Sequence, residues 1–289
     1  MAWGGIVLTE NPVTTYDTFH LNLPRTRVSN IRTTKRDMGG YWEASFQIIP
    51  ESREEAQALL ANILGRQVQI FHDYGDLAWE GMVNTVEMET GTSTLINSLN
   101  DMGNKVWCRY TAIGGASVSR STVYQDATSQ AKYGIKDFVL SGGEINSASA
   151  DQYAKLYRDW NYWPRPNLQQ INTEGQVLDL PRLTVKCIGY IRTFDWRVYN
   201  QTVLTGTATI QVVMTAIVTA CGQFVADTVI EPNNTLVTQE YDADRKALDI
   251  MESLASLGDS DGYAWLMGMT VGRLFYLTQA VPPIRPVSS

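Results

Sequence analysis

The sequence predicts an α+β fold in which two strand-rich modules, each carrying one helix, precede a small α/β module. Three observations lead to this class. Apolar and polar side chains alternate over residues 41–48, a pattern typical of a strand with one buried face. Ser52 and Glu55 then form a capping box, which marks the start of a helix. Residues 210–221 repeat apolar side chains at helical spacing.

The first predicted module, residues 1–115, is mostly strand. Its helix begins after Ser52 and is closed by Gly65, because glycine adopts the left-handed conformation common at helix ends. Strands are expected over 41–48, 68–72, 77–88 and 106–110.

The second predicted module, residues 116–204, follows a small, polar stretch at 112–123 that has the composition of a linker or an extended arm. A helix is expected from Ser147 to Trp160, with the stripe Ala150, Tyr153, Tyr157 and Trp160 facing a sheet. Strands are expected over 133–140, 183–187 and 191–199.

The third predicted module, residues 205–289, is compact and acidic. Residues 206–289 carry four basic and nine acidic side chains, a net charge of −5 out of −7 for the chain. A second helix is expected to start at Asp242 or Asp244, and a hairpin to turn around Val271–Gly272. The helix at 210–221 is predicted to pack its apolar stripe against that hairpin; the stripe comprises Ile210, Val213, Ile217 and Cys221.

Composition excludes several classes of protein. Of 289 residues, 44% are hydrophobic and 18% charged, which is enough apolar material for packed cores and argues against overall disorder. The most apolar stretch, 210–221, is much shorter than the ~20 residues of a membrane span, and the first residues lack the features of a secretory signal. The net charge of −7 argues against nucleic acid as a stable partner. Three cysteines without metal-ligand spacing are expected to be buried free thiols.

The motifs of known catalytic and metal sites are missing from the sequence. It contains two histidines and no nucleophile elbow, zinc-binding HExxH or phosphate-binding glycine loop. Asp259–Gly262 has some likeness to a calcium loop, but Thr270 stands where such a loop needs a bidentate glutamate. We therefore expect no enzyme activity, catalytic residue, cofactor or metal, and an ordinary turn at Asp259–Gly262.

The densest positive run lies near the N-terminus. We consider two interpretations equally: a solvated strand pair, or an interface rim that meets an acidic neighbouring subunit. The residues of this run are Arg25, Arg27, Arg32, Lys35 and Arg36.

A cluster of five aromatic residues lies within 153–163. Core or subunit-interface packing is favoured, since Trp and Tyr are enriched at buried interface centres. The alternative is a stacking platform for carbohydrate. The candidate interface residues of this cluster are Tyr157, Trp160 and Trp163.

Three phrases together resemble a known family. They are Gly39–Phe46 with the helix after Ser52 and Trp79–Val83; Asp126–Gln130 with Tyr133–Lys136, the helix after Ser147, Trp163-Pro164 and Leu183–Tyr190; and Asp242–Met251 leading into Gly262–Trp265. Their order resembles the tail-hub proteins of tailed bacteriophages, which form a trimeric ring at the tail tip or baseplate.

The resemblance implies β-barrel or β-sandwich modules of the tail-tube type around an axis. It implies a structural virion protein that joins the tail tube to the tip and leaves a channel for DNA. The expected partners are copies of the chain itself, forming a trimer, the tail-tube or distal tail protein, and other tail-tip, baseplate or fibre proteins. DNA is met only in transit and no membrane insertion is expected. The expected location is the virion, after assembly in the host cytoplasm. The alternatives are a six-fold distal tail protein or a carbohydrate-binding tail module.

Overall fold

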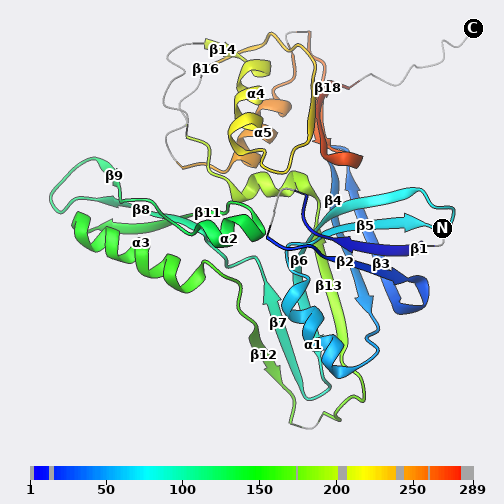
Figure 1. Cartoon of the computed structure of the whole chain (residues 1–289). Helices are drawn as coiled ribbons and strands as arrows, with labels where there is room; N and C mark the ends of the chain where they lie inside the picture. The colour runs from blue at the N-terminus through cyan, green and yellow to red at the C-terminus, as the bar shows by residue number, and fades with distance from the viewer. Residues whose placement is uncertain are drawn as a thin grey trace, which may run out of the picture.

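A computed structural model describes residues 3–12, 16–173, 175–200, 207–238, 244–259 and 261–280. A large mixed sheet, a second sheet of four strands, and helices packed on both make up the α+β fold that the sequence predicts (Figure 1). Within the described residues, no helix is long and apolar enough to span a bilayer.

The large sheet contains β1 (Trp3–Thr9), β2 (His20–Pro24), β3 (Val28–Arg36), β4 (Gly39–Ile48), β5 (Gln67–His72), β6 (Leu77–Glu89), β7 (Ser93–Ser98), β12 (Asn167–Ile171), β13 (Arg182–Ile188), β15 (Asp227–Ile230), β17 (Trp265–Met269) and β18 (Leu274–Gln279). The smaller sheet contains β8 (Lys105–Thr111), β9 (Val118–Arg120), β10 (Tyr124–Gln125) and β11 (Asp137–Glu144), while β14 (Thr207–Thr209) pairs with β16 (Leu236–Thr238). The helices are α1 (Arg53–Asn62), α2 (Ala127–Tyr133), α3 (Ser147–Asn161), α4 (Ile210–Cys221) and α5 (Ala247–Ser256), with 3-10 turns η1 (Arg25–Arg27), η2 (Tyr190–Trp196) and η3 (Val271–Arg273).

The large sheet draws strands from all three predicted modules. Strand β13, from the second segment, lies between β4 and β6 of the first and pairs antiparallel with both. Strand β17, from the third, joins the start of β4 in parallel. The close approach there needs glycine, because a Cβ on Gly40 would lie 2.3 Å from the carbonyl oxygen of Met269. The sheet therefore crosses both predicted boundaries, near 115 and near 204.

The described strands form an open sheet and not a closed barrel. The main path runs β15-β18-β17-β4-β13-β6-β5-β1-β2, with β3 added on β4, and β7 and then β12 added on β6. Strands β2 and β3 are consecutive, but η1 lies between them and no ladder joins them in the part of the chain described here. The sheet therefore stops short of the barrel closure that the resemblance implies.

Alternation along β4 and β13 separates an apolar from a polar face, whereas β6 is buried along most of its length. In β4, Ala44, Phe46 and Ile48 are buried while Glu43 is exposed. Helix α1 covers the apolar face of β6 and β13. As predicted, Ser52 caps this helix, since its hydroxyl accepts a hydrogen bond from the Glu55 amide at 3.1 Å.

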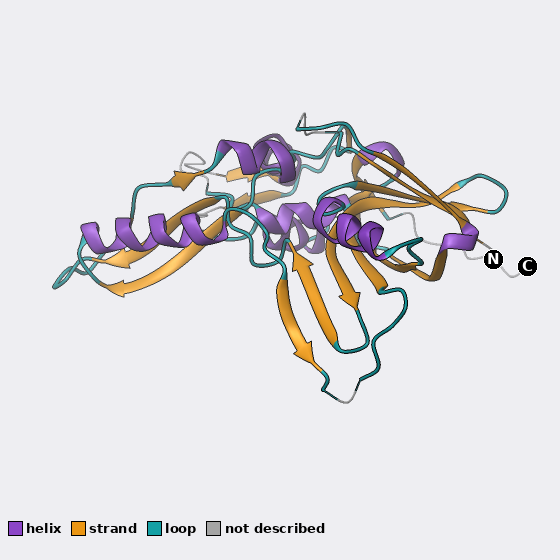
Figure 2. Cartoon of the chain, turned by 60° about the horizontal axis from the view of Figure 1, so that its bottom comes forward, coloured by secondary structure: helices purple, strands orange, loops and turns teal. Residues whose placement is uncertain are grey.

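Helix α3 and strands β8–β11 form a lobe with a separate small core (the α3 lobe). It extends sideways from the large sheet, and the antiparallel pair of β7 and β12 projects in another direction, in both views (Figures 1 and 2). The lobe core is distinct from the main core and consists of Val106, Cys108, Tyr110, Leu140, Ala150 and Ala154.

Several local expectations differ from the structure. Tyr133, predicted to begin a strand, ends α2, which is capped by Asp126. Residues 190–196 form η2 instead of a strand, and the 112–123 stretch contains β9. The N-cap of α3 is Asn146 and not Ser147.

The C-terminal unit is also arranged differently from the prediction. The N-cap of α5 is Lys246 and not Asp244, while Asp242 lies outside the described residues. The predicted stripe of α4 is buried, but the helix packs against α5, and α5 in turn packs against β17 of the predicted hairpin.

Candidate functional surfaces

An apolar face of α3 is exposed to solvent. The helix packs on the lobe sheet through Ala150 and Ala154, whose small side chains let it approach closely. On its outer side, Tyr153, Leu156 and Trp160 follow i, i+3 and i+7, and the Trp160 side chain is 65% exposed. The guanidinium of Arg165 lies 5.4 Å from the Trp160 ring centroid. This outer face ends at a cavity of about 300 Å³ between the end of α3 and β7.

The other two predicted aromatic interface residues point inward. Tyr157 stacks on Phe138 of the lobe sheet, with ring centroids 4.4 Å apart. Trp163 packs edge-on against Tyr133 at 5.3 Å, beside the main core. The predicted stripe is therefore wrong in part: Tyr157 is an internal contact, and Tyr153 and Trp160 face outward.

The basic run lies along η1 and β3, and two of its members are paired within the chain. Arg27, whose side chain is 18% exposed, forms ion pairs with Glu51 at 3.1 Å and with Glu55 at 2.7 Å. Arg25 pairs with Asp73 at 3.4 Å near the surface.

The other two arginines of the run, Arg36 and Arg32, have different surroundings. The Arg36 guanidinium lies 3.8 Å from the centroid of the Trp42 ring, and Arg36 shares a shallow cavity with Glu252 of α5. Arg32 is exposed, and none of the described carboxylates pairs with it.

A groove crosses the polar face of the large sheet and continues toward the lobe (the open-face groove). Its outer part, about 440 Å³, is walled by β3, β4, β6 and β13, with Arg32 and Lys186 among its lining. Its inner part, about 190 Å³, reaches Lys136, Trp196 and Lys246. Four residues line both parts, so the two are continuous: Asn84, Asn100, Ile188 and Arg192.

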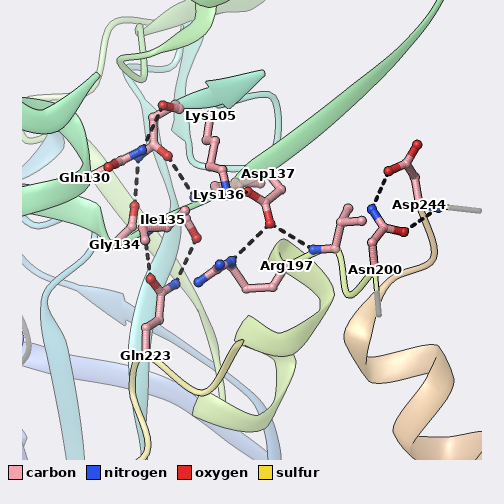
Figure 3. A network of polar contacts seen from close by, with 12 residues as sticks. Lys105, Gln130, Gly134, Ile135, Lys136, Asp137, Arg197, Asn200, Gln223 and Asp244 are labelled. Atoms are coloured by element: carbon pink, nitrogen blue, oxygen red, sulfur yellow. Dashed lines mark hydrogen bonds and ion pairs between the residues drawn. The ribbon is translucent and has the colours of Figure 1, made fainter. Parts of the chain in front are cut away.

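A network of buried polar side chains joins the lobe to the C-terminal unit (Figure 3). The Asp137 carboxylate accepts hydrogen bonds from Arg197 Nε at 3.0 Å and the Val198 amide at 2.9 Å, and pairs with Lys105 at 3.4 Å. The Gln223 side chain bonds both the amide and the carbonyl of Ile135, as a neighbouring strand would. The lobe is therefore anchored by side chains, because no strand ladder between the described residues joins it to the large sheet.

The predicted turn at Asp259 is organised by its carboxylate. Oδ1 accepts from the amides of Asp261 and Tyr263, and Oδ2 accepts from Trp265 Nε1 at 3.1 Å and from the Gln279 side chain at 2.8 Å. Over the described ranges, no three His, Cys, Asp or Glu side chains are grouped as metal ligands would be. The three cysteines are buried and free, and burial raises the pKa of the Cys108 thiol.

Sequence reasoning missed the open-face groove. Lys136, Arg192 and Lys246 lie far from one another in the sequence and come together only in the tertiary fold. Lys186 is the groove residue that the sequence pattern identifies best, because it lies on the polar side of a predicted strand. That position indicates an exposed face of the strand but does not indicate a cavity.

Comparison with known proteins found no matching family model, no similar curated protein and no similar solved structure.

Proposed function

We propose that this chain is a structural ring protein of a bacteriophage tail, a hub that joins the tail tube to the tip. The observation that carries the proposal is the exposed apolar face of Tyr153, Leu156 and Trp160 on a projecting lobe. Apolar patches with aromatic centres are typical of obligate subunit contacts. The choice of the tail-hub family rests on the resemblance of the three ordered sequence phrases between Gly39 and Trp265.

Two further features support assembly with copies of itself or with neighbouring tail proteins. All five residues of β12 are exposed, and among the described strands it pairs only with β7, which leaves one edge open to another chain. The second feature is the partly solvated polar face of β4 in the open-face groove, which suits a water-filled channel; because Arg32, Lys186 and Arg192 line this groove, the face itself attracts phosphate although the chain carries a net charge of −7.

The decisive experiment is the mass of the native assembly, measured by light scattering or native mass spectrometry. Three copies support the hub, and six support the runner-up, a distal tail ring. A monomer at micromolar concentration contradicts both. Trp160→Ala is expected to weaken the assembly by about 2 kcal/mol, as central aromatic contacts do. Tyr74→Ala is the matched control, because Tyr74 is equally exposed (66%) and lies on the β5–β6 turn.

A carbohydrate-binding role is the second candidate, favoured by one observation. Trp160 borders the cavity of about 300 Å³ beside Asp101, Asn161 and Asn167, which places an exposed ring next to polar side chains. A glycan array distinguishes the two roles: binding that Trp160→Ala abolishes while the assembly mass is unchanged supports carbohydrate recognition over a subunit contact.

A further inference from the structure

The inner part of the open-face groove collects cations that lack carboxylate partners. Lys136, directly before β11, is only 8% exposed, and its ammonium donates to the backbone oxygens of Leu99 and, at 2.7 Å, of Asn100. Lys246 reaches the same cavity from the start of α5. Neither lysine forms an ion pair with a carboxylate of the described residues.

Two acids, Asp137 and Asp195, line the same inner cavity, and neither forms an ion pair with Lys136 or Lys246. Asp137 is occupied by Arg197, Lys105 and the Val198 amide, and Asp195 is exposed at the edge. Burial, followed by the charge of Lys246, lowers the pKa of Lys136 to about 8, against smaller opposing effects of Asp101 and Asp195. The ammonium is charged at neutral pH; two backbone oxygens and the Trp196 ring, whose centroid lies 5.5 Å away, stabilise it in part, and an anion in the cavity would supply the counter-charge that these neutral groups do not.

Arg192 adds a third positive group from η2. Its Nη1 pairs with Glu43, its guanidinium lies 5.3 Å from the centroid of the Trp42 ring, and the residue lines both parts of the groove. The inner cavity of about 190 Å³ is much larger than the ~30 Å³ that one water molecule occupies in the liquid. A phosphate ion carries about 1.5 to 2 negative charges and a polynucleotide phosphate carries one; both present acceptor oxygens to the cationic donors of the site.

We propose that the open-face groove binds a phosphate group, held by the side chains of Lys136, Arg192 and Lys246. The phosphate is either a free ion or part of a polynucleotide backbone. This site is independent of the ring-forming role proposed above, so the assembly mass does not decide it.

Calorimetric titration of the full chain with inorganic phosphate, at an ionic strength held constant with sodium chloride, tests the site. Lys246→Gln is expected to weaken phosphate binding by about tenfold, because it removes one charge-assisted hydrogen bond. Lys155→Gln removes the same charge from an exposed position on α3 and is expected to bind as the wild type does. Lys136→Met, with circular dichroism as the folding control, is expected to abolish binding.

A second titration, with a short DNA duplex in the same buffer, identifies the source of the phosphate. Displacement of inorganic phosphate by the duplex assigns a polynucleotide, and no displacement assigns the free ion. The proposal is overturned if the wild type binds no phosphate or if Lys246→Gln binds it with unchanged affinity.

Discussion

Buried charged side chains connect segments that are not neighbouring strands in the described sheets. The carboxylate of Asp244, 2% exposed, pairs with Arg109 at 3.2 Å and Arg120 at 3.1 Å, and so links the approach to α5 with the lobe. Glu80 of β6 accepts a hydrogen bond from the Gly272 amide at 2.8 Å at the tip of the β17–β18 hairpin. Because a buried charge is costly when its partner is removed, these contacts fix where the segments meet.

Lys136 gives a residue-scale prediction for the pH dependence of stability. Its folded pKa of about 8 lies below the ~10.4 of an unfolded lysine. Between these values the unfolded chain binds a proton that the folded chain does not, so the free energy of unfolding rises with pH. Relative to Lys136→Met, the wild type is expected to gain up to ~1.4 kcal/mol per pH unit across this window.

Urea unfolding between about pH 7 and about pH 9.5 measures this difference. Lys155→Met serves as the control, because Lys155 is exposed, and its curve is expected to run parallel to that of the wild type. Parallel curves for Lys136→Met as well would show that burial does not perturb this lysine.

At the scale of elements, hydrophobic periodicity predicts where helices and strands lie better than which face they bury. Strands β4, β5, β6, β8 and β13 and helices α1 and α4 follow the predicted segments closely. On α3, Ala150–Ala154–Tyr157 and Tyr153–Leu156–Trp160 both have helical spacing. The lobe sheet selects the first set, since two alanines permit close packing, and this choice is absent from the local sequence.

Long-range packing also explains the elements that the sequence did not predict. Residues 190–196 are rich in aromatic and branched side chains, which favour a strand, yet they bury Tyr190, Ile191 and Phe194 in a 3-10 turn beneath β4 and α5. The groove residues Lys136, Arg192 and Lys246 come from three distant segments. These residues come together because β13 is inserted into the large sheet, and no local sequence pattern predicts that insertion.

Helix α4 provides an element-scale prediction. Ile217 is fully buried between α4 and the elements packed on it, whereas Thr215 is exposed on the same helix. Ile217→Asp is expected to lower the free energy of unfolding by about 4 kcal/mol or more, because it places an unpaired charge in the core. Thr215→Asp, the matched control, is expected to change it by about 0.5 kcal/mol or less. Urea unfolding and limited proteolysis measure both, and equal stability of the two variants would show that this stripe is not buried in solution.

At the scale of the whole molecule, two of the five residues of the basic run are neutralised within one chain. Arg25 and Arg27 pair with acidic side chains of the N-terminal half, and Arg36 lies over Trp42 beside a cavity shared with Glu252. Arg32, Lys35 and Arg36 are exposed without an ion pair to a described carboxylate, and the charges of Lys35 and Arg36 lie over the rings of Tyr41 and Trp42, so Arg32 is the member most open to a neighbouring chain. We therefore expect the electrostatic contribution of the basic run to assembly to come mainly from Arg32.

Arg32 and Arg27 are expected to respond differently to substitution. Arg27→Ala removes a partly buried pair with Glu55 and is expected to lower the free energy of unfolding by about 1 kcal/mol. Arg32→Glu is expected to leave unfolding unchanged and to slow assembly, because it reverses a charge that faces a net-acidic copy of the chain. Arg182→Glu, an exposed arginine outside the run, carries the same charge change and is the control for net charge.

The dependence of assembly rate on ionic strength separates this effect from a general loss of contact. Screening shortens the range of charge interactions from about 10 Å at 0.1 M salt to about 3 Å at 1 M. The rate deficit of Arg32→Glu is therefore expected to be large at low salt and to shrink as salt rises, whereas the deficit of Trp160→Ala, an apolar truncation, is expected to persist. Light scattering after dilution from dissociating conditions gives both rates. Equal assembly rates for Arg32→Glu and the wild type at low salt would show that Arg32 belongs to a solvated strand and has no electrostatic role in assembly. Trp160 would then be the contact on which assembly depends.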